Sequence, residues 1–359
     1  MKKIQSFAAK LGNSLNRDRS VYIIYMGIFI VTATIFQYVG LLSQANFTLY
    51  SASLFVLLIA SMMILAMGYF FMLVAEKNPR PMEAFRDQLT RFFRSPEEFV
   101  AFLLMMTATS FMLSIFTSIK SFIPKFQHHI YDPLFAHIDR LIHFGLDPWV
   151  ITHAVFISPY MSGFLNVIYN LWFFLYWTIL FLFILRTEPV TIRLQFLTTN
   201  ILYWIVIGGL LATLMASGGP VYYHHFVEGV DPFVQLMERL NSQNIWLEEN
   251  TSFMKLWALP TQDIIWASFI ADGTSMGEGI SAMPSMHISI AVLMALAMGT
   301  INRFFGYFFW FFAILIQIGS VHLAWHYAID GYLSAILTVL IWKMTGKFLA
   351  KRQAKAESV

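Results

Sequence analysis

The sequence contains no cysteine and few charged side chains: of its 359 residues, 12% are charged and 58% are hydrophobic. Without cysteine, the chain can form neither a disulfide nor a thiolate metal site, although the redox compartment does not follow from this absence. A soluble domain of this size would carry about twice this charged fraction. Together with a mean hydropathy of +0.65, the composition excludes an ordinary soluble fold and indicates an integral membrane protein.

The apolar residues lie in charge-free runs of about twenty, the length that crosses a hydrocarbon core as an α-helix. We therefore expect an all-α, polytopic membrane bundle with about eight transmembrane helices, at residues 21–42, 52–74, 99–117, 163–185, 197–217, 284–301, 304–321 and 331–342. Residues 1–95 would hold an interfacial segment and two extra spans, and residues 96–359 a six-helix core. Only Asn302 and Arg303 separate the sixth and seventh runs, which predicts a tight hairpin.

Lys and Arg are distributed unevenly over this layout. If the N-terminus is cytoplasmic, 18 of the 23 Lys and Arg residues fall on the inner side. The positive-inside rule then places both termini in the cytoplasm and the two longest loops, about 120–162 and 218–283, outside. Short inner loops and the lack of a sorting tail favour a bacterial inner membrane, with the long loops in the periplasm or another exoplasmic space.

Two segments outside the spans have amphipathic helical patterns. From Leu134 to Ile142, apolar residues recur at helical spacing and polar residues, including Asp139 and Arg140, lie opposite them. This pattern is typical of a helix in the membrane interface, and a soluble cap helix fits it equally well. Residues 4–15 form a similar stripe flanked by lysines and predict an interfacial anchor.

The sixth run follows the segment 281–287, Ser-Ala-Met-Pro-Ser-Met-His. Pro284 suits the first turn of a helix, where its missing N–H is not needed. The free N–H groups of that turn form an anion site. The Ser285 hydroxyl adds a donor to this site, and His287 lies at its edge. The simpler interpretation is a proline-initiated helix with an incidental interfacial histidine.

His326 and Asp330 open the eighth run and are four residues apart, which on a helix places them on one face. Asp330 can accept the imidazole N–H, fix the tautomer and leave the other nitrogen free as a nucleophile. A structural ion pair is the alternative, although ionisable residues at the start of a span are costly. Because the hairpin returns His326 to the face that holds His287, the pair predicts phosphoryl transfer through a phosphohistidine.

All ten histidines fall on the predicted outer side. His322 is either a phosphate ligand or partner of His326, or a solvated interfacial residue. The Gly-Pro-aromatic turn at residues 217–223 places Tyr222, Tyr223 and His224 where they can line a substrate site. We expect no metal and no cofactor, since adjacent histidines rarely share one ion; the disfavoured metal site would combine His128, His129, His224 and His225 with Asp132.

At these positions the chain resembles the type-2 phosphatidic acid phosphatase superfamily, whose second motif is P-S-G-H and whose third is S-R-x5-H-x3-D. Pro284, Ser285 and His287 match the second motif, with Met286 in place of glycine, and His326 and Asp330 match the third. The replaced glycine, residues 326–330, the turn 217–223 and the segment 139–145 look more like the branch of the inositol-phosphorylceramide and sphingomyelin synthases. The resemblance covers about residues 97–348.

Two basic elements of the family pattern are absent. The first motif, Lys-x6-Arg-Pro, is missing, and Ser320 stands where the third motif has arginine. Such groups clamp a phosphate, so their loss favours a singly charged phosphodiester over a phosphomonoester. Five basic residues on the predicted outer side are candidates to replace them, namely Lys120, Lys125, Arg140, Arg239 and Lys255.

The resemblance implies a six-helix, phosphatase-like core in which His326 attacks the phosphorus, Asp330 orients His326, and His287 protonates the departing oxygen and later activates the acceptor. We expect an integral membrane lipid phosphotransferase that moves a phosphoryl head group from a lipid donor to an alcohol. A phosphatase that releases inorganic phosphate is the alternative, and a lipid transporter or flippase is a more distant one. The expected partner is a membrane lipid (a phospholipid, a ceramide-like lipid or an isoprenoid phosphate) and not a nucleic acid.

Overall fold

The computed structural model describes residues 2–186, 188–271 and 279–357. These residues form helices joined by turns, with no strand among them. The chain divides into two compact units, one comprising Met1–Ile115 and Phe174–Thr198 and the other Phe116–Phe173 and Thr199–Val359. The prediction of an all-α polytopic membrane bundle is confirmed.

The first unit contains the N-terminal helices. They are α1 (Lys2–Arg17), α2 (Arg19–Tyr38), the short turn η1 (Leu42–Gln44), α3 (Ser51–Ala75), α4 (Pro81–Arg94), most of α5 (Pro96–Ser121), the end of α9 (Pro159–Leu185) and the start of α10 (Val190–Ile205). Within this unit the buried Arg193 guanidinium pairs with Asp18, between α1 and α2. Arg17 pairs with Glu98 of α5 at 3.0 Å. These ion pairs fasten the N-terminal helices to α5 and α10.

The second unit contains the remaining helices. They are α6 (Ile123–Phe126), α7 (Asp132–Ile142), α8 (Pro148–Val155), the π-helical turn η2 (Val206–Leu211), α11 (Ala212–Leu214), η3 (Pro220–Tyr222), α12 (Tyr223–Phe226), α13 (Val234–Asn250), α14 (Ala258–Ile270), α15 (Met286–Ile301), α16 (Arg303–His322) and α17 (Ala328–Glu357), together with the end of α5, the start of α9 and the end of α10. The helix expected between Leu134 and Ile142 is α7.

Seven helices in the described part of the chain are long and apolar enough to cross a membrane: α2, α3, α5, α9, the run from α10 to α11, α16 and α17. The sixth predicted span is the shorter apolar helix α15, of 16 residues. It is buried along most of its length, as expected for a helix that is apolar on every face.

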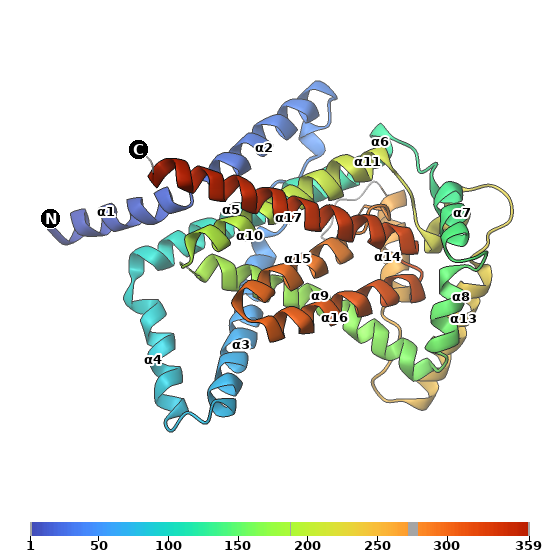
Figure 1. Cartoon of the computed structure of the whole chain (residues 1–359). Coiled ribbons are helices and arrows are strands. Elements are labelled where there is room, and N and C mark those ends of the chain that lie inside the picture. Colours follow the sequence, from blue (N-terminus) through green and yellow to red (C-terminus); the bar gives the residue numbers. More distant parts are fainter. Residues whose placement is uncertain (1, 187, 272–278, 358–359) are drawn as a thin grey trace. The chain divides into compact units, whose positions relative to one another are not determined.

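The hairpin predicted around Asn302 is present and forms the centre of the second unit. Figure 1 shows α15, α16 and α17 side by side, and α15 packs on both of the others. Two glycines allow α15 and α16 to approach closely near their turn, because a Cβ on Gly306 would lie 2.8 Å from the Cα of Gly299. The start of α15, the end of α16 and the start of α17 therefore share one end of this three-helix group.

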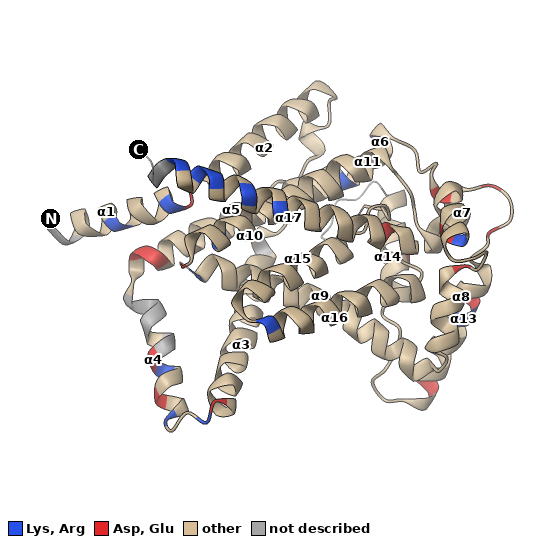
Figure 2. Ribbon diagram, in the orientation of Figure 1, with Lys and Arg blue, Asp and Glu red and all other residues tan. Residues whose placement is uncertain are grey.

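The basic residues of α16 and α17 occupy the other end of this group. Figure 2 shows Lys and Arg along the C-terminal half of α17 and at the start of α16, where Arg303 lies. This separation along the helices is what a positive-inside arrangement requires. The sidedness itself stays a prediction.

Candidate active site

The anion site expected at the start of α15 is built around Ser285. Ser285 is the N-cap residue, and its hydroxyl oxygen accepts from the Ile288 N–H at 3.5 Å, the usual role of serine at this position. The helix begins at Met286, so the expectation that Pro284 occupies the first helical turn is wrong: Pro284 precedes the cap. The N–H groups of Met286 and His287 have no hydrogen-bond partner among the described residues, which leaves them for an anion.

Met286, which stands where the resembled motif has glycine, is accommodated by a glycine on another helix. A Cβ on Gly208, in the π-helical turn η2, would lie 2.8 Å from the Met286 sulfur and 2.6 Å from the Phe116 ring. The missing side chain at Gly208 therefore makes room for the larger residue at 286.

His287 lies between two aromatic side chains of α9. Its ring centroid is 4.6 Å from that of Tyr169 and 4.4 Å from that of Trp172. Trp172 also donates its indole N–H to the His287 carbonyl oxygen at 3.1 Å. These contacts fix the orientation of the imidazole.

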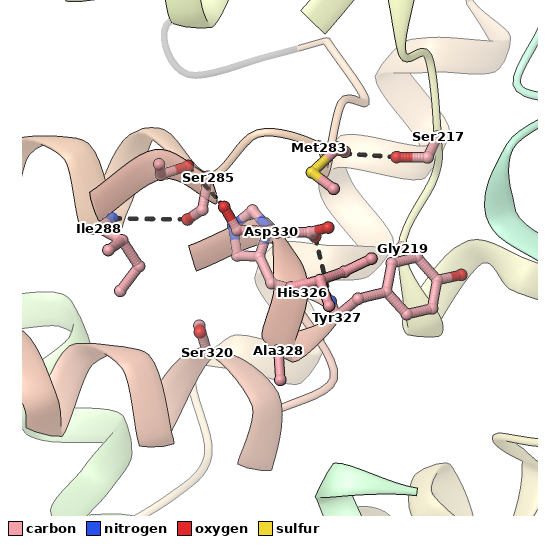
Figure 3. A network of polar contacts seen from close by, with 12 residues as sticks. Ser217, Gly219, Met283, Ser285, Ile288, Ser320, His326, Tyr327, Ala328 and Asp330 are labelled. Carbon is pink, nitrogen blue, oxygen red and sulfur yellow. Dashed lines mark hydrogen bonds and ion pairs between the residues drawn. The ribbon is translucent and has the colours of Figure 1, made fainter. Parts of the chain in front are cut away.

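His326 lies beside His287, with 5.9 Å between the ring centroids. The His326 Nδ1 faces the Asp330 Oδ2 at 3.1 Å, and the same oxygen accepts from the Tyr327 N–H at 3.0 Å. Figure 3 shows this network. His326 precedes the first residue of α17, Ala328, so the expectation that His326 and Asp330 share a helical face is wrong. The turn before the helix brings them together instead.

Backbone hydrogen bonds join the three turns that carry these residues. The Ser285 N–H donates to the Asp330 carbonyl oxygen at 3.2 Å, and the Ala282 N–H donates to Ser217 at 2.9 Å. The turn after Ser217 reaches the third turn through the Val221 N–H, which donates to Ala324 at 3.0 Å. Ser217, Ser285 and Asp330 are labelled in Figure 3.

The environment of His326 favours its neutral form. Burial lowers the pKa of His326, and the charge of Lys120 at the end of α5 lowers it further, whereas the Ala282 carbonyl group acts in the opposite direction. A neutral imidazole whose Nδ1–H donates to Asp330 has an unprotonated Nε2, which is the form required of a nucleophile. The site can therefore present an uncharged nucleophile beside a helix N-terminus.

Two buried carboxylates of α7 belong to this site although the sequence interpretation gave them no role in catalysis. Asp139 accepts from the N–H groups of Ala328 and Ile329, at 2.7 and 2.9 Å. Asp132 accepts from the N–H groups of Gly218 and Gly219 and from the Tyr327 hydroxyl, each at 2.8 Å. Their position opposite the apolar stripe of α7 was the sequence feature that could have indicated their burial.

The remaining predicted site residues make other contacts. His322 is fully buried, stacks on His153 with centroids 3.6 Å apart, and faces the Ser162 hydroxyl at 2.7 Å. Arg140 forms a bidentate ion pair with Asp147, with both distances 2.8 Å. No direct contact between these residues and His287 or His326 is seen in the described part of the chain.

The aromatic turn after Ser217 also packs away from the two catalytic candidates. The Tyr222 hydroxyl donates to the Gln262 carbonyl oxygen at 2.9 Å, and Tyr223 packs on Phe233. His224 is exposed and lies 3.8 Å from Asp231. The role of these residues in binding substrate stays a prediction.

A comparison of sequences identifies the family. Residues 134–344, more than half of the chain, match the profile of the PAP2 superfamily. The chain belongs to the PAP2 superfamily. The match includes Ser285, His287, His326 and Asp330 and most of the second unit, so the PAP2 region and the described site coincide. No curated protein and no solved structure matches the chain significantly. As a PAP2 membrane protein, the chain is a phosphatase-type enzyme.

Proposed function

We propose that this protein is an integral membrane lipid phosphotransferase that moves a phosphoryl head group from a lipid donor to an alcohol acceptor through a phosphohistidine. The observation that carries the proposal is the pair of imidazoles with centroids 5.9 Å apart, one held by Asp330 and the other at the start of α15. Two imidazoles at this separation can act on the same phosphorus. The proposed partner is a phospholipid, a ceramide-like lipid or an isoprenoid phosphate.

In the first half-reaction, the His326 Nε2 lone pair attacks phosphorus and the P–O bond to the donor lipid breaks. The departing oxygen takes a proton from the His287 imidazolium. The proton on the His326 Nδ1 stays in its hydrogen bond to Asp330, whose negative charge stabilises the positive charge that develops on the phosphorylated ring. The products are the dephosphorylated lipid fragment and an enzyme with an N–P bond.

In the second half-reaction, neutral His287 takes the proton of the acceptor hydroxyl as its oxygen attacks phosphorus and the N–P bond breaks. His287 is then protonated and His326 is neutral, so the site returns to its starting state. The Ser285 hydroxyl and the free N–H groups of Met286 and His287 hold the phosphoryl oxygens while negative charge builds on them. Lys120 is the basic residue of the predicted outer set whose charge acts on His326.

A phosphodiester donor fits the small number of basic residues that are left to bind the phosphate. The clamp motifs of the resembled family are missing, and Arg140, one of the proposed substitutes, is engaged by Asp147. A phosphodiester carries one negative charge and a monoester close to two, so the diester requires fewer cations. This argument favours transfer, as in the inositol-phosphorylceramide and sphingomyelin synthase branch, over release of phosphate. We place the reaction on the exoplasmic side, with both termini cytoplasmic.

Product analysis tests the proposal. Purified protein is incubated with a panel of lipid phosphates and phosphodiesters labelled separately in the head group and the acyl chain, with and without alcohol acceptors. Transfer predicts a new labelled phospholipid that depends on the acceptor, whereas the alternative phosphatase predicts inorganic phosphate. Acid-labile, base-stable label on the protein after rapid quenching would support the phosphohistidine.

A lipid transporter or flippase fits the structure less well. Transport sites lie near the middle of the membrane in interrupted helices, whereas His287, His326 and Asp330 cluster at one end of the α15–α17 group. Movement of labelled lipid between leaflets without any new product would nevertheless replace the enzymatic proposal.

A further inference from the structure

Helix α7 presents its carboxylates to the protein and its apolar side chains outward. Asp132 and Asp139 are buried, with 0% and 3% of their surface exposed. Leu141 and Phe144, on and just after the same helix, are 71% and 99% exposed. A helix at the surface of a soluble protein has the opposite arrangement. The buried carboxylates and the exposed apolar side chains of α7 are therefore both unusual.

The inward face holds both turns that neighbour the catalytic candidates. Asp139 binds the first two amides of α17 that lie between His326 and Asp330 in sequence, at Ala328 and Ile329. Asp132 binds the turn at Gly218 and Gly219 and the hydroxyl of Tyr327. No cation forms an ion pair with either carboxylate in the described part of the chain, so amides and one hydroxyl supply their hydrogen bonds.

The position of Asp139 bears directly on the His326–Asp330 contact. The first N–H groups of any helix lack partners within the helix, and Asp139 supplies these partners from a different element. Without Asp139, the Asp330 carboxylate, which already accepts from the preceding Tyr327 N–H, could accept from these amides as well, in competition with His326. We infer that Asp139 and Asp132 are positioning residues of the proposed reaction, holding the turn 326–330 so that Asp330 orients His326. The inference rests on the proposed function for its kinetic part only.

The pH dependence of the reaction reports on this arrangement. Burial raises the pKa of Asp139 to about 6; its two amide partners oppose the change, and the charge of Asp330 adds to it. His143 and Tyr332 also face this carboxyl group. A protonated Asp139 has one oxygen fewer to accept from the amides. We therefore expect the wild-type rate to fall as the pH decreases through about 6.

The test compares Asp139→Asn with Asp263→Asn, which changes an exposed carboxylate of α14. For Asp139→Asn we expect kcat to fall at least tenfold with KM within twofold, and the inflection near pH 6 to disappear; Asp263→Asn should match the wild type. A change in KM alone, or an unchanged pH profile, would overturn the inference.

A second variant tests Asp132. Tyr327→Phe removes only the bond to Asp132, should fold, and should lower kcat severalfold. An unchanged kcat would contradict the role of Asp132.

A measurement without substrate separates this inference from the proposed function. Amide hydrogen exchange of the peptide 324–330, followed by mass spectrometry, should be slow in the wild type and at least tenfold faster at Ala328 and Ile329 in Asp139→Asn. Unchanged exchange would overturn the inference whatever the protein's activity. Absence of any lipid turnover by the wild type, with the exchange result as expected, would instead refute the proposed function.

The outward face of α7 carries an independent proposal. Asp139 contacts the first residues of α17, a membrane-spanning helix, so α7 lies at the end of a span. Phe144 has a φ of 59°, a conformation that is strained for a bulky residue, and its ring is almost completely exposed. We propose that Leu141 and Phe144 rest in the lipid interface, with the adjacent Ile142 and Leu146, which are 50% and 52% exposed.

The absence of cysteine makes this proposal directly testable. Phe144→Cys, with Glu249→Cys on α13 as an exposed control, is spin-labelled and reconstituted in phosphatidylcholine–phosphatidylglycerol vesicles. The label at 144 should collide with oxygen more than with a water-soluble nickel complex, and the label at 249 should show the reverse. Equal access of nickel to both positions, or dipolar coupling between labels at 144 in two copies of the chain, would overturn the proposal.

Discussion

Replacing Asp330 with asparagine should reduce activity without reducing stability. The Asp330 Oδ2 accepts from His326 and from the Tyr327 N–H, whereas Oδ1 is buried without a partner among the described residues. An asparagine with its oxygen in the Oδ2 position keeps both hydrogen bonds and the shape of the side chain. The substitution therefore removes the negative charge and little else.

The loss of rate follows from the charge that develops on His326. Opposite unit charges about 4 Å apart interact by about 4 kcal/mol at an effective dielectric constant of about 20. If about half of the positive charge has developed in the transition state, the carboxylate stabilises it by about 2 kcal/mol. At about 1.4 kcal/mol for each factor of ten, Asp330→Asn should lower kcat by about 30-fold.

Stability should change in the other direction. A fully buried carboxylate is costly because it leaves water, and the neutral amide avoids part of this cost. We expect the thermal midpoint in detergent to be unchanged or raised, and Asp263→Asn serves as the control for the chemistry of the substitution. A lowered midpoint with an activity loss that matches the unfolded fraction would refute a catalytic role for Asp330, as would a wild-type kcat.

Three further outcomes are expected. His326→Ala should lose nearly all turnover and Ser285→Ala should be impaired, because an acid–base or nucleophilic role contributes roughly two to four powers of ten; wild-type turnover by pure His326→Ala protein would refute the nucleophile assignment. Turnover should be undiminished in excess chelator, since histidines and helix N–H groups hold the phosphate, and abolition that added divalent metal reverses would favour a metallophosphatase. Gly219→Ala should inactivate the enzyme and lower its thermal midpoint. Gly219 has a φ of 86°, and a Cβ there would lie 2.7 Å from the Trp325 carbonyl oxygen. An active, equally stable variant would contradict the close packing of the two turns.

The parts of the fold that the sequence predicted are those governed by hydropathy. The spans, the hairpin at Asn302 and the meeting of His287 with His326 follow from long apolar runs and from antiparallel neighbours joined by short turns. The start of α15 was misplaced by two residues because proline is common at the first helical position, whereas here it precedes the cap. In this chain the Ser285 side chain determines the boundary.

The contacts of polar residues in the long loops could not be predicted in the same way. His322 and Tyr222 each had a plausible role near phosphate, but their partners, Ser162 and Gln262, are distant in sequence. Arg140 had one too, but it pairs with Asp147, seven residues further along the chain. Hydropathy contains no information about which loop packs on which. The buried carboxylates of α7 are an exception, since they lie opposite the apolar stripe that the sequence already shows between Leu134 and Ile142.

The backbone hydrogen bonds between the three turns of the site constrain how such a protein can diverge. The bonds from Ser285 to Asp330, from Ala282 to Ser217 and from Val221 to Ala324 depend on main-chain atoms, so exchanging side chains does not abolish them, whereas inserting or deleting one residue shifts their register. Lengths should thus be invariant within 217–221, 282–285 and 324–330 and free to vary in the connections between them. Loop grafts that alter lipid preference belong in those connections.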